Sequence, residues 1–201
     1  NYRELEIKAG SVDHPVVGKV TLEATMHDID LRQTSWLIRP SADLPVGKLE
    51  SRIIIDSRHL GAYIGIKDLR VEAPAEDTND STGGTTESGI SGSKGLVFTG
   101  TPAKAGFDKL VSVTVDLSIA GPGQTTLVFT PTGVVTGPNT ADQPVPADKR
   151  TAVLGAFAGT LPGQKLPFGI PPTAEGARGS DIIIEGIAEE ITVRLGGFKQ
   201  T

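Results

Sequence analysis

The sequence predicts a mainly β protein of the α+β kind, with long curved antiparallel sheets of about nine strands and one or two short helices. Residues 111–119 read VSVTVDLSI, in which apolar and polar side chains alternate as they do in a half-buried strand. The chain also has 25 glycines and 14 prolines among 201 residues, which is well above ordinary usage and indicates many turns. Together these patterns favour antiparallel sheets joined by tight turns.

Length and charge narrow the class of protein. A chain of 201 residues fits one sizeable domain or two small ones, and we expect a single domain over residues 1–201. The formal net charge of −5 argues against a nucleic-acid partner, because phosphate binding needs a basic surface. There is no cysteine, so the chain has neither disulfides nor thiolate metal sites. Because strand rhythm starts at Tyr2, we expect an upstream targeting segment or the start of the domain to be missing.

Alternation defines the strands of the first half. Leu5, Ile7 and Ala9 alternate with charged residues, and a second strand follows over Val20–Met26. At Asp28 the apolar phase inverts, and because strands repeat every two residues, a bulge or bend is expected between Met26 and Asp28.

After the second strand, the sequence predicts a break before the next strand, a short helix and a long polar loop. Leu44–Gly47 contains a proline and a glycine and predicts a break before a strand over Leu49–Ile55. Ser57 is the predicted N-cap of a short helix that presents Leu60 and Ile64 on one face. Residues 76–93 contain almost no large apolar side chain and predict a mobile polar loop. The neighbouring strands are predicted at residues 69–73 and 96–99.

The second half contains a hairpin and a late helix. Residues 111–119 and 125–135 flank the turn Gly121–Gly123 and should pair antiparallel. A helix is predicted over Ala147–Leu161, where four apolar residues recur at helical spacing. These residues are Val153, Leu154, Phe157 and Leu161. A polar glycine-rich turn then precedes a last strand that runs to Leu195, with Ile187, Ile191 and Val193 on one face.

The segment Leu166–Pro172, reading LPFGIPP and called the ribbon below, has the most unusual composition. Its prolines fix φ and remove hydrogen-bond donors, so it is neither a central strand nor a helix interior. An extended apolar segment must be covered by protein or must cover a ligand, since exposure of apolar surface costs about 25 cal/mol per Å². The interior is therefore either a dry core or an apolar groove.

Catalytic patterns are weak throughout. His14, His27 and His59 fall in different elements without metal-ligand spacing, so we interpret them as solvated side chains. Asp28 and Asp30 share a strand face, a pattern more typical of a solvated strand end than of acid/base chemistry. The sequence therefore favours a binding or structural protein that is not an enzyme and needs no cofactor. An enzyme with a cleft around His27, Asp28 and Asp30 is a third hypothesis.

Several segments occur in an order that resembles a known family. They are Tyr2–Ile7, Ala24–Leu31, Leu49–Val71, Gly95–Gly100, the late helix, Leu166–Ile170 and Ile182–Leu195. This order resembles the LmeA-like family of actinobacterial cell-envelope proteins, which are described as phospholipid-binding. The resemblance implies non-enzymatic lipid binding or shuttling in envelope maintenance, outside the cytoplasmic membrane, with a signal or anchor upstream. The chain departs from the family in its missing N-terminal helix and in the polar insertion at residues 76–93.

Under this resemblance the expected partner is a phospholipid or another acyl-chain lipid, with contact to a membrane surface. Aliphatic side chains of the sheets, late helix and ribbon would line the lipid site: Val113, Val115, Leu154, Phe157, Leu161, Leu166, Phe168 and Ile170. Arg58, Lys67 and Arg70 are candidates for a headgroup contact. The alternative is a structural or accessory subunit that docks on a membrane-associated complex through the ribbon, with a membrane protein as its partner.

Overall fold

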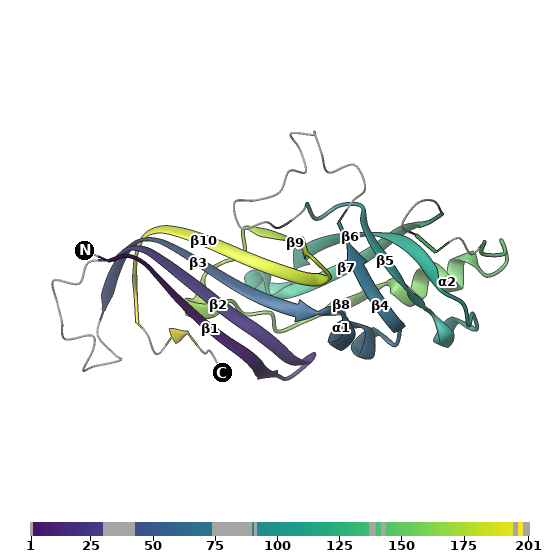
Figure 1. Ribbon diagram of the computed structural model, residues 1–201, viewed down its shortest axis with the longest axis horizontal. Helices are drawn as coiled ribbons and strands as arrows, with labels where there is room; N and C mark the ends of the chain where they lie inside the picture. The colour runs from purple at the N-terminus through teal and green to yellow at the C-terminus, as the bar shows by residue number, and fades with distance from the viewer. Residues whose placement is uncertain are drawn as a thin grey trace.

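The computed structural model describes residues 2–29, 43–73, 90, 92–136, 140–141, 144–194 and 197–198. In this part of the chain the strands form two five-stranded antiparallel sheets (Figure 1). The strands are β1 (Tyr2–His14), β2 (Gly18–Ile29), β3 (Leu44–Asp56), β4 (Lys67–Glu72), β5 (Leu96–Thr101), β6 (Val111–Ala120), β7 (Thr126–Val135), β8 (Gly159–Leu161), β9 (Ala174–Arg178) and β10 (Asp181–Val193). The helices are α1 (Ser57–Ile64) and α2 (Arg150–Phe157), with short 3-10 turns at η2 (Ala103–Ala105), η3 (Pro122–Gln124) and η4 (Pro167–Gly169).

The two sheets lie end to end along the long axis of the molecule (Figure 1). One has the strand order β1-β2-β3-β10-β9 and curls into a half-barrel; we call it the curled sheet. The other has the order β4-β5-β6-β7-β8 and carries α2 against β7. The predicted class, long curved antiparallel sheets with two short helices, is confirmed. The predicted pairing of residues 111–119 with 125–135 is also confirmed as the β6–β7 ladder.

The pleat of the curled sheet inverts at one row across three strands. Asp28 on β2 and Glu190 on β10 have φ of 55° and 50°, and Gly47 lies beside Asp28 on β3. Beyond this row Ile29, Val46, Ile191 and Val193 lie on the buried face. The predicted phase change near Met26–Asp28 is therefore confirmed, and it is shared by neighbouring strands. The inversion also shows that the prediction for the last strand is wrong, because Ile187 does not share a face with Ile191 and Val193. Ile187 pairs with Glu50 on the polar face, whereas Ala188 faces the core.

The N-cap of helix α1 lies one residue earlier than predicted. Asp56 is the N-cap, and its carboxylate accepts a 2.7 Å hydrogen bond from the Arg58 backbone N–H, whereas Ser57 is already helical. Gly65 ends the helix at φ 77°, in the left-handed region that glycine tolerates. Leu60 and Ile64 are buried as predicted.

Leu44–Gly47 is part of β3, so the predicted break there is wrong. Near Pro45 the described strands pair β3 with β10 only, because the β2 ladder ends at the His27–Lys48 pair. A proline is tolerated at such an edge because it removes only a donor that no neighbour needs.

The late helix is shorter than predicted. Helix α2 ends at Phe157 because Ala158 adopts an extended conformation, and Leu161 then belongs to β8, opposite Leu127 on β7. The predicted glycine-rich turn before the last strand is in fact β9, which pairs with β10 through the tight turn at Gly179. A five-residue strand with one glycine and no large apolar side chain gives little alternation, which explains the omission.

A single cluster of buried apolar side chains connects both sheets and α2. Inside it, the rings of Phe98 and Phe129 pack edge to face with centroids 5.9 Å apart. Asp30 and residues 76–89 lie outside the described residues, whereas Ile90 is buried.

Candidate functional site

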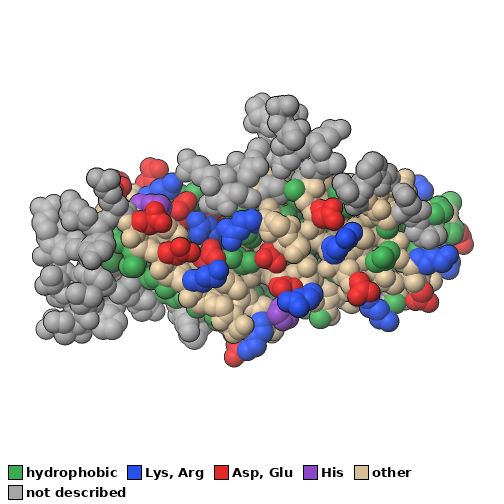
Figure 2. Space-filling view, viewed as in Figure 1, with side chains coloured by type: hydrophobic (Ala, Val, Ile, Leu, Met, Phe, Trp, Pro, Cys, Tyr) green, Lys and Arg blue, Asp and Glu red, His purple; other side chains and the backbone are tan. Residues whose placement is uncertain are grey.

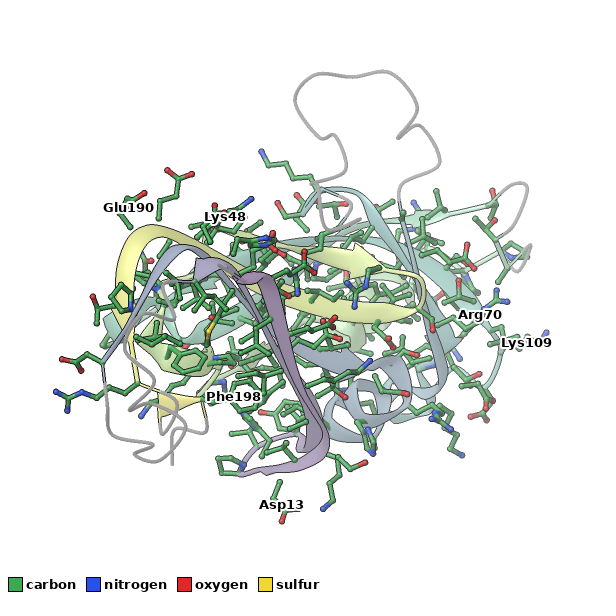
Figure 3. The ribbon with its side chains drawn as sticks, turned by 60° about the vertical axis from the view of Figure 1, so that its left-hand side comes forward. Asp13, Lys48, Arg70, Lys109, Glu190 and Phe198 are labelled. Atoms are coloured by element: carbon green, nitrogen blue, oxygen red, sulfur yellow. The ribbon has the colours of Figure 1, made fainter. Side chains whose placement is uncertain are left out.

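The concave face of the curled sheet is aliphatic. Strand alternation places side chains from β2, β3 and β10 on this inner face. They are Leu22, Ala24, Met26, Leu49, Ser51, Ile53, Ile184, Gly186 and Ala188. Met26, Leu49 and Ile53 are at most 1 % exposed. Figure 3 shows side chains filling the hollow of this sheet, with Phe198 among them.

The ribbon lies on this inner face. Leu166 and Ile170 are 2 % and 5 % exposed, and η4 within the ribbon contacts β2 and β3. Phe168 is partly buried, and its ring packs against that of Phe198 with centroids 5.9 Å apart. The prediction that the ribbon must be covered is thus confirmed: the cover is the curled sheet. Its apolar side chains face inward, which leaves little apolar surface for the alternative docking role.

The predicted lipid-contact residues all lie in or against the buried cluster, in two groups. Val113, Val115, Phe157 and Leu161 are fully buried around β6, β7 and α2, with Leu154 partly buried beside them. Leu166, Phe168 and Ile170 form the second group, on the curled sheet. The first group lines the second sheet and the other lines the half-barrel.

The predicted headgroup residues are on the surface. Arg58 on α1 donates to both carboxylate oxygens of Asp56, at 3.2 and 3.1 Å. Arg70 on β4 lies 3.6 Å from Glu72, and Lys67 on the same strand is exposed. Their role as headgroup contacts stays a prediction.

A surface pocket of about 210 Å³ lies where the curled sheet meets α1. Basic and acidic groups line it together, including Lys19, Arg58, His59, Asp56 and Asp181. Hydrogen bonds from Arg58 lower the pKa of Asp56. Burial, together with the facing Asp56 carboxylate, raises the pKa of Asp181, its direct cross-strand neighbour.

The convex face of the curled sheet carries a buried ion-pair row that sequence reasoning missed. Arg52 donates from Nε to Glu185 at 2.7 Å, and its other nitrogens lie 3.5 Å from Glu23 and 3.4 Å from Glu50. These four residues are at most 7 % exposed. Figure 2 shows acidic and basic side chains interleaved over this part of the surface. The sequence does contain a signal for these ion pairs, because charged residues recur at the polar positions of three adjacent strands.

The three histidines lie in different parts of the fold and make different contacts. The ring of His14 bonds the backbone near the ribbon, His27 contacts Glu50 at 2.9 Å, and His59 lines the surface pocket. Among the described residues, no group of three or more His, Asp or Glu side chains is placed to hold a metal ion. No helix in the described ranges has the length and apolar character needed to cross a membrane.

Two inner-face residues also escaped the sequence analysis. Ser51 and Gly186 occupy core positions on β3 and β10, where the alternation demands large apolar residues. A small residue in an otherwise aliphatic phase is the only signal that could have revealed them.

An aliphatic half-barrel closed by an apolar ribbon suits the shielding of acyl chains, because each buried methylene contributes about 0.8 kcal/mol. Comparison with known families matches residues 1–187 to the family described as LmeA-like phospholipid-binding. Comparisons with curated proteins and with solved structures give no significant match. The match includes the ribbon and most of the curled sheet, and it implies phospholipid binding in the cell envelope. The chain therefore belongs to the LmeA-like phospholipid-binding family.

Proposed function

We propose that the protein binds a phospholipid by taking its acyl chains into the apolar interior, without catalysing a reaction on the lipid. The observation that carries this proposal is the aliphatic concave face of the curled sheet, which is continuous with the apolar cluster around α2. Transfer of the acyl chains out of water is favourable in free energy, while the charged headgroup stays at the surface. The residues 1–201 act in this as one binding module.

We further propose that the protein works on the extracytoplasmic side of the membrane, reached through a segment upstream of residue 1. The envelope role of the family supports this location. There the protein would carry single lipid molecules between membrane surfaces as part of envelope maintenance. The formal charge of −5 offers no bulk attraction to anionic headgroups, so binding depends on apolar contact.

The test is extraction of lipid from vesicles of phosphatidylglycerol and phosphatidylcholine, followed by quantification of lipid in the re-isolated protein. We expect bound lipid in the unmodified protein and a rise in its melting temperature, since a ligand that binds the folded state stabilises it. Ala188→Asp places a charge at a partly buried position on the concave face of the curled sheet and should reduce bound lipid strongly. Leu110→Asp is the matched control, because Leu110 is 48 % exposed. Equal lipid in both variants, or none in the unmodified protein, contradicts the proposal.

A further inference from the structure

A row of small residues crosses the centre of the inner face. Ala24, Ser51 and Gly186 are direct cross-strand neighbours on β2, β3 and β10, and all three are buried. Larger side chains stand on both sides of this row: Leu22, Ile53 and Ile184 on one side, and Met26 and Leu49 on the other. The row therefore forms a trench in the floor of the half-barrel.

The ribbon fills this trench. A β-carbon placed on Gly186 would lie 2.4 Å from the Pro171 carbonyl oxygen, 2.7 Å from Leu166 Cδ1 and 2.9 Å from Ile170 Cγ2. Real β-carbons do not approach other atoms so closely, so only glycine permits this contact. The ribbon thus presses its aliphatic side chains onto bare backbone, in the place where an acyl chain would fit.

The ribbon is fastened at its ends. Before it, the Gln164 N–H donates to the Thr125 carbonyl at 2.8 Å; after it, the Thr173 N–H donates to the Glu185 carbonyl at 2.7 Å. Between these points the described residues make only local backbone hydrogen bonds, from the Lys165 N–H to the Gly163 carbonyl and from the Gly169 N–H to the Leu166 carbonyl. Within the described part of the chain, apolar contacts therefore hold the middle of the ribbon on the sheet.

Two further observations show that the closed arrangement is imperfect. Phe168 adopts φ 61°, a left-handed conformation that is strained for a bulky residue. In the trench the Ser51 hydroxyl is fully buried and, within the described part of the chain, has no hydrogen-bond partner. A buried polar group without a partner is costly and rare in native structures, so its presence calls for a ligand or a functional explanation.

We propose that the ribbon occupies the acyl-chain site of the empty protein and that an ester-linked phospholipid displaces it. This inference rests on the proposed function and specifies its site. The acyl chain takes over the contacts of Leu166 and Ile170 with the trench. The ester carbonyl accepts a hydrogen bond from the Ser51 hydroxyl, which satisfies the orphaned group.

The first test locks the ribbon in place. A side chain at Gly186 would itself push the ribbon away, so the lock is placed at Gly197, just after β10. A β-carbon there would lie 3.8 Å from Phe168 Cα, an ordinary contact within the reach of a disulfide. The chain has no native cysteine, so the pair Phe168→Cys and Gly197→Cys is the only thiol pair present, and its disulfide ties the middle of the ribbon to the end of β10. Oxidised protein should take up at least tenfold less phosphatidylglycerol from vesicles than the same protein treated with dithiothreitol. The unmodified protein should be insensitive to the reductant.

The outcomes separate this inference from the proposed function. If the unmodified protein takes up no lipid, the proposed function fails first. If it takes up lipid and the oxidised pair takes up as much, the ribbon is not the displaced element and the inference is wrong. Persistence of free thiols under oxidation, with the variant folded, would also overturn it, because Phe168 would then not rest beside Gly197 and the ribbon would not be closed.

The second test does not depend on the disulfide. Ser51→Ala removes the orphaned hydroxyl, so the folded protein should be as stable as before or more so. Its affinity for a diester phosphatidylcholine should fall about three- to tenfold, the loss of one hydrogen bond. Its affinity for the diether analogue, which lacks the carbonyl, should not change. Equal effects on the two lipids, or no effect on either, contradict the role of Ser51.

Discussion

His14 and Gly163 lie 149 positions apart in sequence, yet the imidazole Nε2 donates a 3.0 Å hydrogen bond to the Gly163 carbonyl. The other ring nitrogen, Nδ1, accepts from the backbone N–H groups of Val16 and Val17 at 3.1 and 3.2 Å. Because Nδ1 is an acceptor, Nε2 must carry the proton. One side chain thus closes the β1–β2 turn and fastens the segment that leads into the ribbon.

Replacement of this ring should loosen the start of the ribbon. His14→Ala removes three part-buried hydrogen bonds, and we expect a loss of about 1–2 kcal/mol in the free energy of unfolding. Amide hydrogen exchange at Gln164 should accelerate more than exchange in β6. His59→Ala is the control, since that histidine lies on α1 away from the ribbon. Unchanged exchange at Gln164 would show that His14 does not hold the ribbon.

The buried ion pairs on the convex face predict a large effect of one substitution. Arg52→Met leaves Glu185, Glu23 and Glu50 without their shared cation, and breaking a buried pair costs about 3–5 kcal/mol. Arg70→Met, at a pair on the surface, should cost less than about 1 kcal/mol. Urea unfolding of both variants measures the difference. Similar losses would mean that the Arg52 row contributes no more than a surface pair.

Stability should depend on pH through Glu175, whose side chain lies beside Ile184 in the β9–β10 pair. Burial raises the pKa of this carboxyl above its ordinary value of 4.5. The folded state therefore holds the proton more tightly than the unfolded state, so its stability falls as the pH rises from about 4.5 through the raised pKa. Glu175→Gln should be more stable than the unmodified protein near neutral pH.

Below about pH 4 this advantage should disappear, because the carboxyl is then protonated in both states. Urea unfolding across the pH range checks the prediction, and Glu6→Gln on exposed β1 is the control. A stabilisation by Glu175→Gln that is constant with pH would show that the charge is not its cause.

Two helical glycines should respond to alanine with opposite signs. Gly155 on α2 has open space where a β-carbon would go, so Gly155→Ala should raise stability by up to about 1 kcal/mol through helix propensity. On α1, a β-carbon at Gly61 would lie 2.8 Å from the Ile66 carbonyl oxygen and 3.0 Å from Leu69 Cβ. Gly61→Ala should therefore be destabilising. Thermal unfolding of both variants measures the two changes in stability. Changes of the same sign would contradict the close packing of α1 on β4.

Alternation predicted the strands well because an apolar side chain on a half-buried strand has only one face to occupy. It even located the inversion at Asp28, since Ile29 could not stay on the polar face. It failed where tertiary partners decide the outcome. Pro45 is tolerated because only one neighbouring strand pairs with β3 at that point. Helix α2 ends at Phe157, and Leu161 instead pairs with Leu127 in the β7–β8 ladder.

The candidate site was predictable in part. Composition alone showed that the ribbon needs cover, because apolar prolines and leucines cannot remain in water. Its partner was hidden, since Gly186 and Ser51 matter only through contacts between segments 15 or more residues apart along the chain, which no local pattern records.

The most direct measurement is photo-crosslinking with a phosphatidylcholine that carries a diazirine in its acyl chain, followed by mapping of the labelled peptides. Acyl chains in the half-barrel should label the inner-face segments of β3 and β10, around Ser51 and Gly186, and Leu110→Asp should leave that pattern unchanged. Labelling confined to exposed apolar side chains, of which Leu110 and Tyr63 are described examples, would show adsorption at the surface and contradict an interior lipid site.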